Sequence, residues 1–526
     1  MRKQFIIHSI AIILVFGGIG WFWPPMLWAF IIFGPLILMG VYDMFQTRHA
    51  IKRNFPLLGR GRYILESMGP KVNQYFIESD SEGRPFHRKF RSIIYQRAKK
   101  ELDTQAFGTP QDVYKTGYEW MEHSIYPLDG EKLDQSPRVM IGGRDCKQPY
   151  SASILNISAM SYGSLSKSAI LALNGGAKIG GFAQNTGEGG ISEYHLRPGG
   201  DLIWQIGTGY FGCRDREGNF SPENFAENAC GKTVKMIDIK ISQGAKPGHG
   251  GILPAEKNTP EIAEMRQIEP YKRVNSPPFH TAFTNPVELM EFIQKLRELS
   301  GGKPVGFKLC VGKKSEFIAL CKAMLSTGIK PDYITVDGGE GGTGAAPMEF
   351  TDAVGMPLRD GLAFVVDTLR GFDLKREIKV IASGKIVFGF HMFRAMALGA
   401  DTCNCARAMM LALGCIQALE CNKNTCPTGI TTQKPELVKG LNVKNKTNRV
   451  ASYHGGTVKT LVEMVAAAGL DSVEKIERRH VNRRVDLNRI VRYDQIFPPV
   501  EIGCLLKPDS IPDSFKLIME ELEARE

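Results

Sequence analysis

A chain of 526 residues is longer than one ordinary domain, although a single α/β barrel with extensions can take up several hundred residues. Its 43% hydrophobic and 23% charged residues are typical of a folded globular protein and exclude a mainly disordered one. The formal charge of +11 allows nucleic acid, an acidic membrane surface or anionic substrates as partners. Eleven cysteines do not make a disulfide scaffold in a chain of this length, and their clustering indicates metal or cofactor chemistry in a reducing compartment.

The N-terminal segment is apolar over a long stretch. Residues 4–42 contain no Asp, Glu, Lys or Arg, a run of 39 residues, whereas one bilayer crossing needs about 20. Pro24 and Pro25 would break a helix in the middle, so we predict a transmembrane hairpin with helices over Phe5–Phe22 and Met26–Tyr42. One long signal anchor, or a hydrophobic arm packed on the protein, is the alternative.

Basic residues flank the predicted hairpin on both sides. They are Arg2, Lys3, Arg48, Lys52, Arg53, Arg60 and Arg62. The positive-inside rule places both ends of the hairpin in the cytoplasm, which predicts a protein of the cytoplasmic membrane with its catalytic domain facing the cytoplasm. This topology also accounts for much of the basic charge. Because no aromatic residues interleave with the basic ones to stack bases, we do not expect nucleic acid as a partner.

The composition predicts four segments. Residues 1–45 hold the hairpin, 46–150 a juxtamembrane and helical lead-in, 151–440 the main domain, and 441–526 a charged C-terminal helical extension. In the main domain, short β-rich runs that end in polar turns alternate with helical runs, as in "SASILNISAMSYGSLS" before "KSAILALNGGAKIG". Such units predict a TIM (β/α)8 barrel of parallel strands. An open doubly wound sheet is the alternative, but no G-x-G-x-x-G fingerprint follows the first strand.

The chemistry of a TIM barrel lies at the carboxyl ends of its strands, where this sequence has glycine-rich turns and cations. "ASGKI" (382–386) and "CNCARAMM" (403–410) stand where late strands bind phosphate, and Arg407 would add positive charge. Lys308 in "GFKLC" would point a cation into the barrel mouth or reach solvent from the strand end. "QGAKPGHGG" and "VDGGEGGTGAAP" favour close approach of backbone to a planar or phosphorylated ligand, or are flexible loops.

Three cysteines are closely spaced in "GCIQALECNKNTCPTG" (414–429): Cys415, Cys421 and Cys426. Three thiols are too few for a tetrahedral zinc site and too many for an isolated disulfide. Cys403 and Cys405 lie just upstream, where we expect them in the barrel core, although either could supply a fourth ligand from a looser loop. The remaining cysteines show no ligand spacing, and we expect small buried side chains there.

The turn motifs together resemble a known family. They occur in the order "SAMSYGSLS", "QNTGEGG", "QGAKPGHGGILP", "SPPFH", "DGGEGGTGAAP" and "ALGCIQALECNKNTCPTGITTQ". This order is similar to that of the FMN-binding synthase domain of glutamate synthase, over residues 158–433. The upstream runs "GRPFHRKFRSIIYQRAK" and "FGTP" resemble the lead-in of stand-alone members, which are commonly tethered to a membrane.

The resemblance implies two cofactors. The spacing C-x5-C-x4-C-P matches the family's 3Fe-4S motif, so Cys415, Cys421 and Cys426 are the implied cluster ligands, without excluding a 4Fe-4S form. FMN would lie at the barrel mouth, where Lys308 would stabilise negative charge on the reduced flavin. The implied FMN-binding residues are Met160, Ser161, Lys308, Gly338, Gly339, Gly384, Lys385, Ala406 and Arg407.

The resemblance also implies the reaction, which is reductive amination of 2-oxoglutarate to L-glutamate. The implied substrate-binding residues are Lys240, Gln243 and Lys246. Glu188 in "QNTGEGG" matches a family carboxylate beside the path of ammonia, where it could take up a proton from ammonium. We therefore expect Glu188, Gln243, Lys246 and Lys308 as catalytic residues.

Some expected parts of a large glutamate synthase are not found in this sequence. It shows no glutaminase domain with an N-terminal cysteine and no NADPH fingerprint, so we expect free or glutamine-derived ammonia, and electrons from ferredoxin or a membrane redox component. A different amino or keto acid is an alternative substrate. The main alternative function is a membrane-tethered FMN and iron–sulfur electron carrier.

Overall fold

The computed structural model describes residues 1–101 and 103–524. Leu102 in the predicted lead-in and the last two residues of the predicted extension lie outside the described residues. The chain divides into two compact units, Met1–Arg88 and Lys89–Glu526, so the first unit ends inside the segment predicted as the lead-in.

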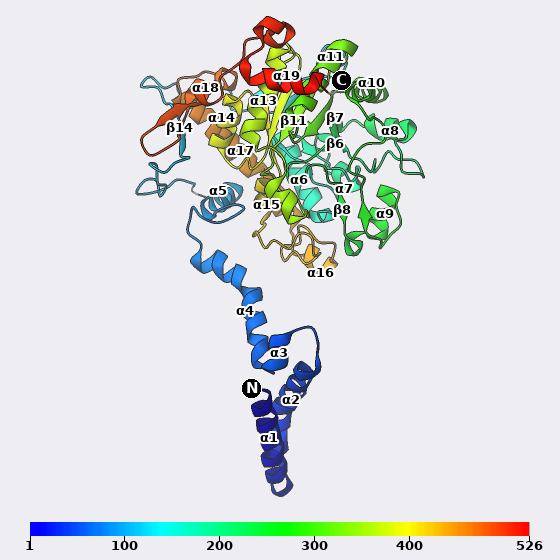
Figure 1. Cartoon of the computed structure of the whole chain (residues 1–526), viewed down its shortest axis with the longest axis vertical. Helices are drawn as coiled ribbons and strands as arrows, with labels where there is room; N and C mark the ends of the chain where they lie inside the picture. The colour runs from blue at the N-terminus through cyan, green and yellow to red at the C-terminus, as the bar shows by residue number, and fades with distance from the viewer. Residues whose placement is uncertain (102, 525–526) are drawn as a thin grey trace. The chain divides into compact units, whose positions relative to one another are not determined.

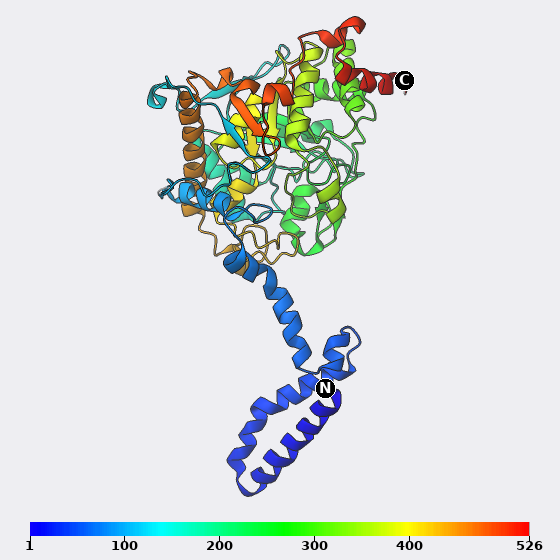
Figure 2. The same ribbon diagram turned by 60° about the vertical axis from the view of Figure 1, so that its left-hand side comes forward.

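The first unit begins with a helical hairpin. Helices α1 (Arg2–Phe22) and α2 (Phe30–Phe45) are joined by a 3-10 turn over Pro24–Ala29 and lie side by side (Figure 2). The ring of Phe16 in α1 stacks on that of Phe33 in α2, with centroids 5.2 Å apart. The predicted break at the proline pair is confirmed, because the 3-10 turn begins there.

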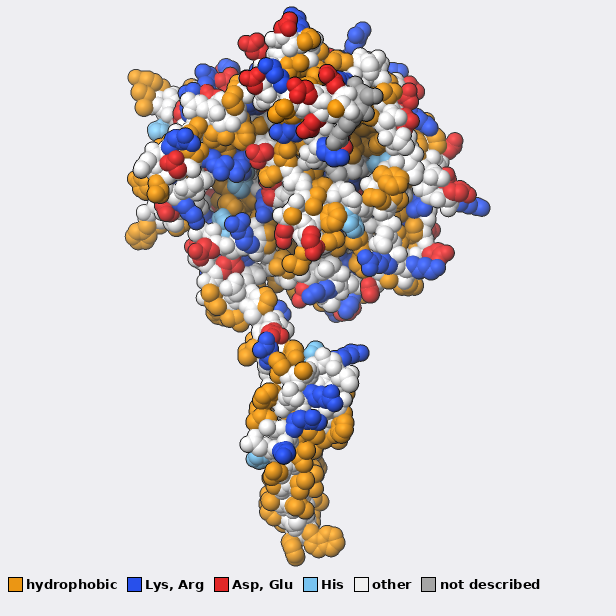
Figure 3. Space-filling view, viewed as in Figure 1, with side chains coloured by type: hydrophobic (Ala, Val, Ile, Leu, Met, Phe, Trp, Pro, Cys, Tyr) orange, Lys and Arg blue, Asp and Glu red, His pale blue; other side chains and the backbone are white. Residues whose placement is uncertain are grey.

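Two segments of the hairpin, Arg2–Phe22 and Pro24–Phe45, are long and apolar enough to cross a bilayer, with mean hydropathies of 2.2 and 1.9. Their side chains are mostly exposed, which distinguishes them from the core helices of soluble proteins. Figure 3 shows hydrophobic side chains covering the hairpin and basic side chains gathered beside it. A signal sequence near the N-terminus has similar length and composition.

Two further helices follow in the first unit, α3 (Ala50–Asn54) and α4 (Leu58–Val72). Asp43, near the end of α2, is fully buried. Its carboxylate accepts hydrogen bonds from Nε and Nη2 of Arg60, each at 2.8 Å, and one from the Leu57 backbone N–H at 3.2 Å. This paired charge fixes the start of α4 against the end of the hairpin.

A closed barrel of parallel strands forms the centre of the second unit, so the predicted TIM barrel is confirmed (Figure 1). The strands follow chain order around the barrel. They are β4 (Leu155–Ile157), β5 (Gln184–Asn185), β6 (Leu202–Ile206), β7 (Val234–Lys240), β10 (Val305–Leu309), β11 (Tyr333–Asp337), β12 (Lys379–Ser383) and β13 (Thr402–Cys405). Cys403 and Cys405 are buried in β13, as expected for core residues.

A helix follows each barrel strand. These helices are α6 (Lys167–Gly180), the short α7 (Glu193–Leu196), α8 (Pro222–Ala229), α10 (Pro286–Leu299), α11 (Lys314–Thr327), α13 (Leu358–Gly371), α14 (Gly389–Ala397) and, after the last strand, α17 (Val443–Ala467). Ser166 caps α6 by accepting a hydrogen bond from the Ala169 N–H. A Cβ at Gly176 would lie 2.5 Å from the Val450 side chain, so this glycine permits the close packing of α6 on α17.

An antiparallel hairpin closes the amino end of the barrel. Strands β2 (Arg138–Ile141) and β3 (Tyr150–Ser153) pair with each other. Ile141 and Tyr150 pack with Ile203, Met236 and Tyr333 from the starts of barrel strands in one buried cluster. Burial of each such side chain contributes about 1.5–3 kcal/mol. This apolar floor leaves the opposite, carboxyl end for a polar site.

The segment predicted as a helical extension also contains strands. β14 (Val481–Arg484) pairs with β15 (Ile490–Arg492) and with β1 (Glu119–Met121) from the lead-in. The charged composition concealed this hairpin, although Arg483 faces the buried Glu119 and not water. Helices α18 (Tyr493–Ile496) and α19 (Asp513–Glu523) complete the extension.

Glu119 in β1 is the centre of a buried charge network. Its carboxylate pairs with Arg359, with Arg394 at 2.6 Å and with Arg483 at 3.6 Å, and accepts a hydrogen bond from the Tyr493 hydroxyl at 2.8 Å. Burial alone would raise the pKa of Glu119, but the nearby arginines outweigh it and lower the pKa. Glu119 therefore ties the lead-in, the barrel helices and the extension together as an ionised group.

Candidate active site

The predicted site residues all lie at or just beyond the carboxyl ends of the barrel strands. They are Met160 and Ser161 after β4, Glu188 after β5, Lys240 in β7 with Gln243 and Lys246 after it, Lys308 in β10, Gly338 and Gly339 after β11, Gly384 and Lys385 after β12, and Ala406 and Arg407 after β13. The parallel, closed topology brings these turns to one end of the barrel.

Glu188 and Lys240 form a partly buried ion pair with Lys246 near it. Glu188 Oε2 lies 2.8 Å from Lys240 Nζ. Burial alone would raise the pKa of Glu188, but Lys240, Lys246 and Arg266 outweigh it and lower the pKa to about 2. Burial lowers the pKa of Lys246 to about 8, although Glu188 acts in the opposite direction. Glu188 is therefore ionised at neutral pH, and the pKa of Lys246 lies closer to neutrality than that of an ordinary lysine.

Arg266 is a buried cation beside Glu188 that sequence reasoning missed. It ends α9 (Pro260–Arg266), outside the strand-end turns. Its Nη2 donates to the Tyr162 carbonyl at 2.9 Å, and its guanidinium lies 5.1 Å from the Phe211 ring centroid. A Cβ at Gly189, in the turn that carries Glu188, would lie 2.7 Å from Arg266 Nη2. No spacing in the sequence links α9 to this turn, so only the fold shows the contact.

Lys308 is buried and points into the barrel. Its Nζ lies 3.8 Å from Asp337 Oδ2 at the end of β11. Asp238 in β7 is a second buried acid close enough for the charge of Lys308 to affect it. Burial raises the pKa of Asp238 despite the opposing effects of Lys308, Gln205 and Asn185. The alternative of a solvent-reaching Lys308 is therefore wrong, because its neighbours are buried acids.

A polar layer lies inside the barrel around Asp238. Asn185 and Gln205 both donate to Asp238 Oδ2, at 2.9 and 2.7 Å. Within the described part of the chain, Asp238 Oδ1 and the buried Asn404 Oδ1 accept no hydrogen bond. Buried polar atoms normally have partners, so these two oxygens indicate places where a ligand would donate. Alternation along β7 puts Asp238 on the same face as Lys240, a pattern from which it could have been predicted.

The glycine-rich turns pack mainly against one another. A Cβ at Gly338 would clash with Glu340 and Leu358, and one at Gly339 with the Gly355 carbonyl. The chain's own packing therefore accounts for these two glycines.

In the turn after β12, the glycine is explained by its backbone conformation and not by close packing. Gly384 and Lys385 both have positive φ, of 150° and 48°. Consecutive residues of this kind point backbone N–H groups into a concave anion-binding turn.

Backbone contacts hold the turns after β4 and β7. A Cβ at Gly187 would lie 2.7 Å from the Ser161 nitrogen, and the Met160 N–H donates to the Asn185 carbonyl at 3.4 Å. The Gln243 carbonyl accepts the Lys246 N–H at 3.2 Å, which turns the chain back over the mouth. The two turns are therefore set by main-chain geometry before any ligand binds.

Two histidines near the mouth have structural environments. His280 lies between the Lys240 carbonyl, 2.9 Å from Nε2, and the Tyr210 hydroxyl, 3.1 Å from Nδ1. Burial lowers the pKa of His280 to about 4, so the ring is neutral at neutral pH. The ring of His249 packs edge-on against that of Phe350. Neither residue was assigned a catalytic role from the sequence.

The three-cysteine loop lies beside the turn that follows β13. The Cys415 carbonyl accepts from the Tyr95 hydroxyl at 2.6 Å, and the Cys421 carbonyl accepts from Lys257 Nζ at 2.7 Å. Arg407 donates to the Thr343 carbonyl and lies 3.8 Å from Cys421 Sγ through Nη1. Arg407 therefore joins the barrel mouth to the cysteine loop.

The backbone of the cysteine loop is unusual. Gln417, Leu419 and Asn424 all have left-handed φ values, of 56°, 57° and 57°. Such residues are strained and concentrate at functional sites. Within the described chain, no group of three or more His, Cys, Asp or Glu side chains is placed to hold a metal ion. The cysteine thiols therefore supply the right donor chemistry without showing ligand geometry.

The thiols differ in their surroundings. Burial raises the pKa of Cys415. Burial acts in the same direction on Cys426, but hydrogen bonds from Thr428 and Thr431 outweigh it and lower the pKa, with Thr428 Oγ1 3.3 Å from the sulfur. The loop thus favours a thiolate at its buried end.

The chain is similar to known proteins over most of its length. The family model described as the conserved region in glutamate synthase matches residues 125–471. The glutamate synthase large subunit-like protein YerD of Bacillus subtilis is 38% identical over 504 residues, which cover 88% of this chain and 95% of YerD. The archaeal glutamate synthase (NADPH) of Methanocaldococcus jannaschii is 36% identical over 334 residues, 63% of this chain. This chain spans 62% of that relative's length.

A mutant flavocytochrome b2 with benzoylformate matches with a TM-score of 0.44 and 12% identity, over 90% of this chain and 94% of that one. This likeness is too weak to assign a fold or ligand. The barrel and the family matches define the class, which is an oxidoreductase of the glutamate synthase type. The chain belongs to the glutamate synthase family.

Proposed function

We propose that this protein binds FMN at the carboxyl end of the barrel and converts 2-oxoglutarate and ammonia to L-glutamate. The observation that carries the proposal is the group of buried charges around Glu188. Lys240 is already paired with Glu188, at 2.8 Å, which leaves Lys246 and Arg266 for an anionic substrate. Two carboxylates on one small keto acid match two cations in one pocket.

The chemistry of the barrel interior fits a flavin. The pyrimidine edge of a flavin offers acceptors to Lys308 and a donor to an open oxygen such as Asp238 Oδ1 or Asn404 Oδ1. The turn at Gly384 and Lys385 has N–H groups suited to the phosphate. FMN, when bound, supplies hydride transfer to the substrate. The residues proposed to hold it are Met160, Ser161, Lys308, Gly338, Gly339, Gly384, Lys385, Ala406 and Arg407.

Glu188 acts on the nitrogen substrate in this proposal. With a pKa of about 2 it is an anion at neutral pH, so it attracts ammonium but is a weak base. Separation from Lys240 would raise its pKa and allow it to take the proton from ammonium. Gln243 lies in the same turn as Lys246. Its side-chain amide would donate to a carboxylate of the substrate and so orient it.

We also propose that Cys415, Cys421 and Cys426 hold a 3Fe-4S cluster, since three thiolates match three irons. A cluster at this position would pass electrons singly toward the barrel. Arg407 supports this route because it contacts both the Cys421 sulfur and the loop that follows β11. The electrons would come from ferredoxin or a membrane redox component. The exposed apolar hairpin favours anchoring in the cytoplasmic membrane, with the barrel on the cytoplasmic side.

The test uses the detergent-solubilised full chain under anaerobic conditions. The flavin is reduced with dithionite, 2-oxoglutarate and ammonium are added, and flavin reoxidation and glutamate are followed together. We expect glutamate in a one-to-one ratio with reoxidised flavin. A flavin that stays reduced with both cofactors intact would contradict the proposal and favour an electron carrier or another keto acid.

A matched pair of variants locates the substrate. Lys246→Gln should raise KM for 2-oxoglutarate about tenfold, because one charge-assisted contact is lost. Lys232→Gln, at an exposed position before β7, should leave KM unchanged.

A further inference from the structure

A second cavity lies at the amino end of the barrel, opposite the candidate active site. Its volume is about 460 Å³. It is bounded by the chain that leads into β12, by the turn before β13, and by residues of the C-terminal extension. Lys379 is the first residue of β12 and Asp401 immediately precedes β13, which places the cavity at the strand starts.

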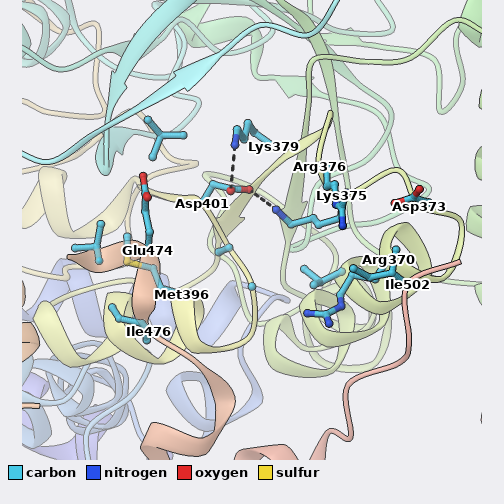
Figure 4. A pocket seen from close by; sticks show the side chains of 15 residues that line it. Arg370, Asp373, Lys375, Arg376, Lys379, Met396, Asp401, Glu474, Ile476 and Ile502 are labelled. Carbon is cyan, nitrogen blue, oxygen red and sulfur yellow. Dashed lines mark hydrogen bonds and ion pairs between the residues drawn. The ribbon is translucent and has the colours of Figure 1, made fainter. Parts of the chain in front are cut away.

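Basic side chains predominate on one side of this cavity in Figure 4, where Arg370, Lys375 and Arg376 lie together with the exposed Asp373. Lys375 pairs with Asp401 at 2.8 Å, and Lys379 lies 3.8 Å from the same carboxylate. Asp401 is therefore already neutralised. Neither Arg370 nor Arg376 forms an ion pair with any residue that the structure describes.

Arg370 is held in place by its backbone with its guanidinium uncommitted. It lies in the last turn of α13, and its carbonyl accepts the Gly503 N–H at 3.0 Å. Its Nε is buried and has no hydrogen-bond partner among the described residues. The nearby Asp367 makes its ion pair with Arg478, at 2.8 Å, and interacts with Arg370 only through its charge. A buried donor such as this Nε is destabilising unless something accepts from it.

The opposite side of the cavity is mostly apolar. Met396 and Ile476 lie across the cavity from the arginines in Figure 4, with Glu474 beside them, while Ile502 lies next to Arg370. Apolar side chains beside a few charged groups are the usual composition of a small-molecule site, and 460 Å³ is within the usual size. The cavity thus has room for an organic body as well as an anionic group.

We propose that this cavity binds an organic anion that carries phosphate or carboxylate groups on an apolar body. The anionic groups would accept from Arg370 and Arg376, whose planar guanidinium groups suit either oxyanion. The body would pack on Met396, Ile476 and Ile502. Bound there, the ligand would join the extension to the barrel and stabilise their contact.

The site depends on chain beyond the glutamate synthase match. That match ends at residue 471, whereas Glu474, Ile476 and Ile502 line the cavity. The proposed site is thus assembled jointly by the barrel and the extension. Its position at the strand starts separates it from the proposed FMN and 2-oxoglutarate sites, and its test does not depend on catalysis.

The test measures thermal unfolding and isothermal titration on the full chain in detergent. The probes are ADP for organic phosphates, benzene-1,2-dicarboxylate for carboxylates on an apolar body, and inorganic phosphate as an anion without a body. We expect ADP or benzene-1,2-dicarboxylate to raise the unfolding midpoint, and the responding probe gives the source of the anion. Inorganic phosphate should have a smaller effect at equal concentration. An absent response to both organic probes, or an equal response to inorganic phosphate, would overturn the proposal.

Variants assign the binding to this cavity. Arg370→Gln and Arg376→Gln should each weaken binding of the responding probe about tenfold. Arg216→Gln removes the same charge from an exposed position outside the cavity and should bind normally. Arg376 is exposed, so we expect Arg376→Gln to fold. If Arg370→Gln fails to fold, the affinity of Arg376→Gln for the probe tests the proposal. Unchanged affinity in the arginine variants would place the anion elsewhere and contradict the proposal.

Discussion

At the scale of single residues, the buried charged side chains at the mouth of the barrel shift one another's pKa values in opposite directions. Glu188 raises the pKa of Lys246, while burial and Lys240 lower it, with a result of about 8. A protonated Lys246 is needed to bind a carboxylate, so substrate binding should be present below pH 8 and lost as the pH rises through that value. The active site is thus set for use at neutral pH.

Glu188→Gln should move this loss of binding to lower pH. The variant removes the carboxylate that raises the pKa of Lys246, so Lys246 loses its proton earlier. The measurement is KM for 2-oxoglutarate across a pH series. Glu193→Gln, an exposed change in the next helix, should keep the original profile. A profile that stays in place, or shifts to higher pH, in Glu188→Gln would contradict the charge network.

Lys308→Met should lower the reduction potential of the bound flavin. The buried ammonium is the cation placed to stabilise a reduced, anionic ring, and its loss leaves Asp238 and Asp337 nearby. We expect a decrease of about 30 mV or more, which corresponds to about 1.4 kcal/mol for two electrons. A redox titration followed by flavin absorbance measures this. Lys313→Met, at an exposed position after β10, is the control, and equal potentials in the two variants would count against the role of Lys308.

The sequence predicted the residues that directly follow strands, and missed those that the fold brings in from elsewhere. Glu188, Lys240 and Lys246 could be placed together because parallel strands end at one face. Arg266 could not, because a helix inserted after β7 returns it to the mouth. The contact of Arg407 with Cys421 depends on side-chain direction, which spacing alone does not give.

At the scale of elements, the hairpin β2–β3 should contribute strongly to stability. Ile141 is fully buried in the barrel floor, while the adjacent Met140 is 55% exposed. Ile141→Ala should lower the free energy of unfolding by about 2–5 kcal/mol, and Met140→Ala should change it little. Urea unfolding followed by circular dichroism gives both values. Similar losses in the two variants would show that the floor is not closed by this strand.

The cysteine loop gives a second element-scale prediction. Cys421→Ser should abolish the EPR signal of the proposed cluster and leave flavin absorbance unchanged, because the FMN residues lie on the barrel turns. Cys230→Ser replaces an exposed thiol and should keep both signals. Persistence of the cluster signal in Cys421→Ser would remove Cys421 from the ligand set.

Elements with a local sequence pattern were easier to predict than strands that pair with a distant part of the chain. The run "KSAILALNGGAKIG" coincides with α6 because its apolar spacing, its serine cap and the glycine that follows it agree. The pairing of β14 with β1 was not predicted, because the two strands lie more than three hundred residues apart in the sequence. Strand pairing over such a separation leaves no local pattern.

At the scale of the whole molecule, the hairpin should anchor the protein as an integral component. Extraction from the membrane would transfer the apolar surface of its two helices from lipid to water, which is unfavourable. The full chain should remain in the membrane pellet after washes with high salt and with alkaline carbonate, as followed by immunoblot. Release by salt alone would indicate a peripheral, electrostatic attachment.

The small sheet around Glu119 sets an order for folding during synthesis. β1 emerges from the ribosome early, yet its partner β14 follows the last barrel strand, β13. At about 5–20 residues per second, several seconds separate completion of the barrel strands from synthesis of the extension. Until then Glu119 lacks Arg483 and Tyr493, two of its four side-chain partners. The nascent barrel therefore lacks these contacts at first, and residues of the extension later stabilise a domain whose strands were synthesised before them.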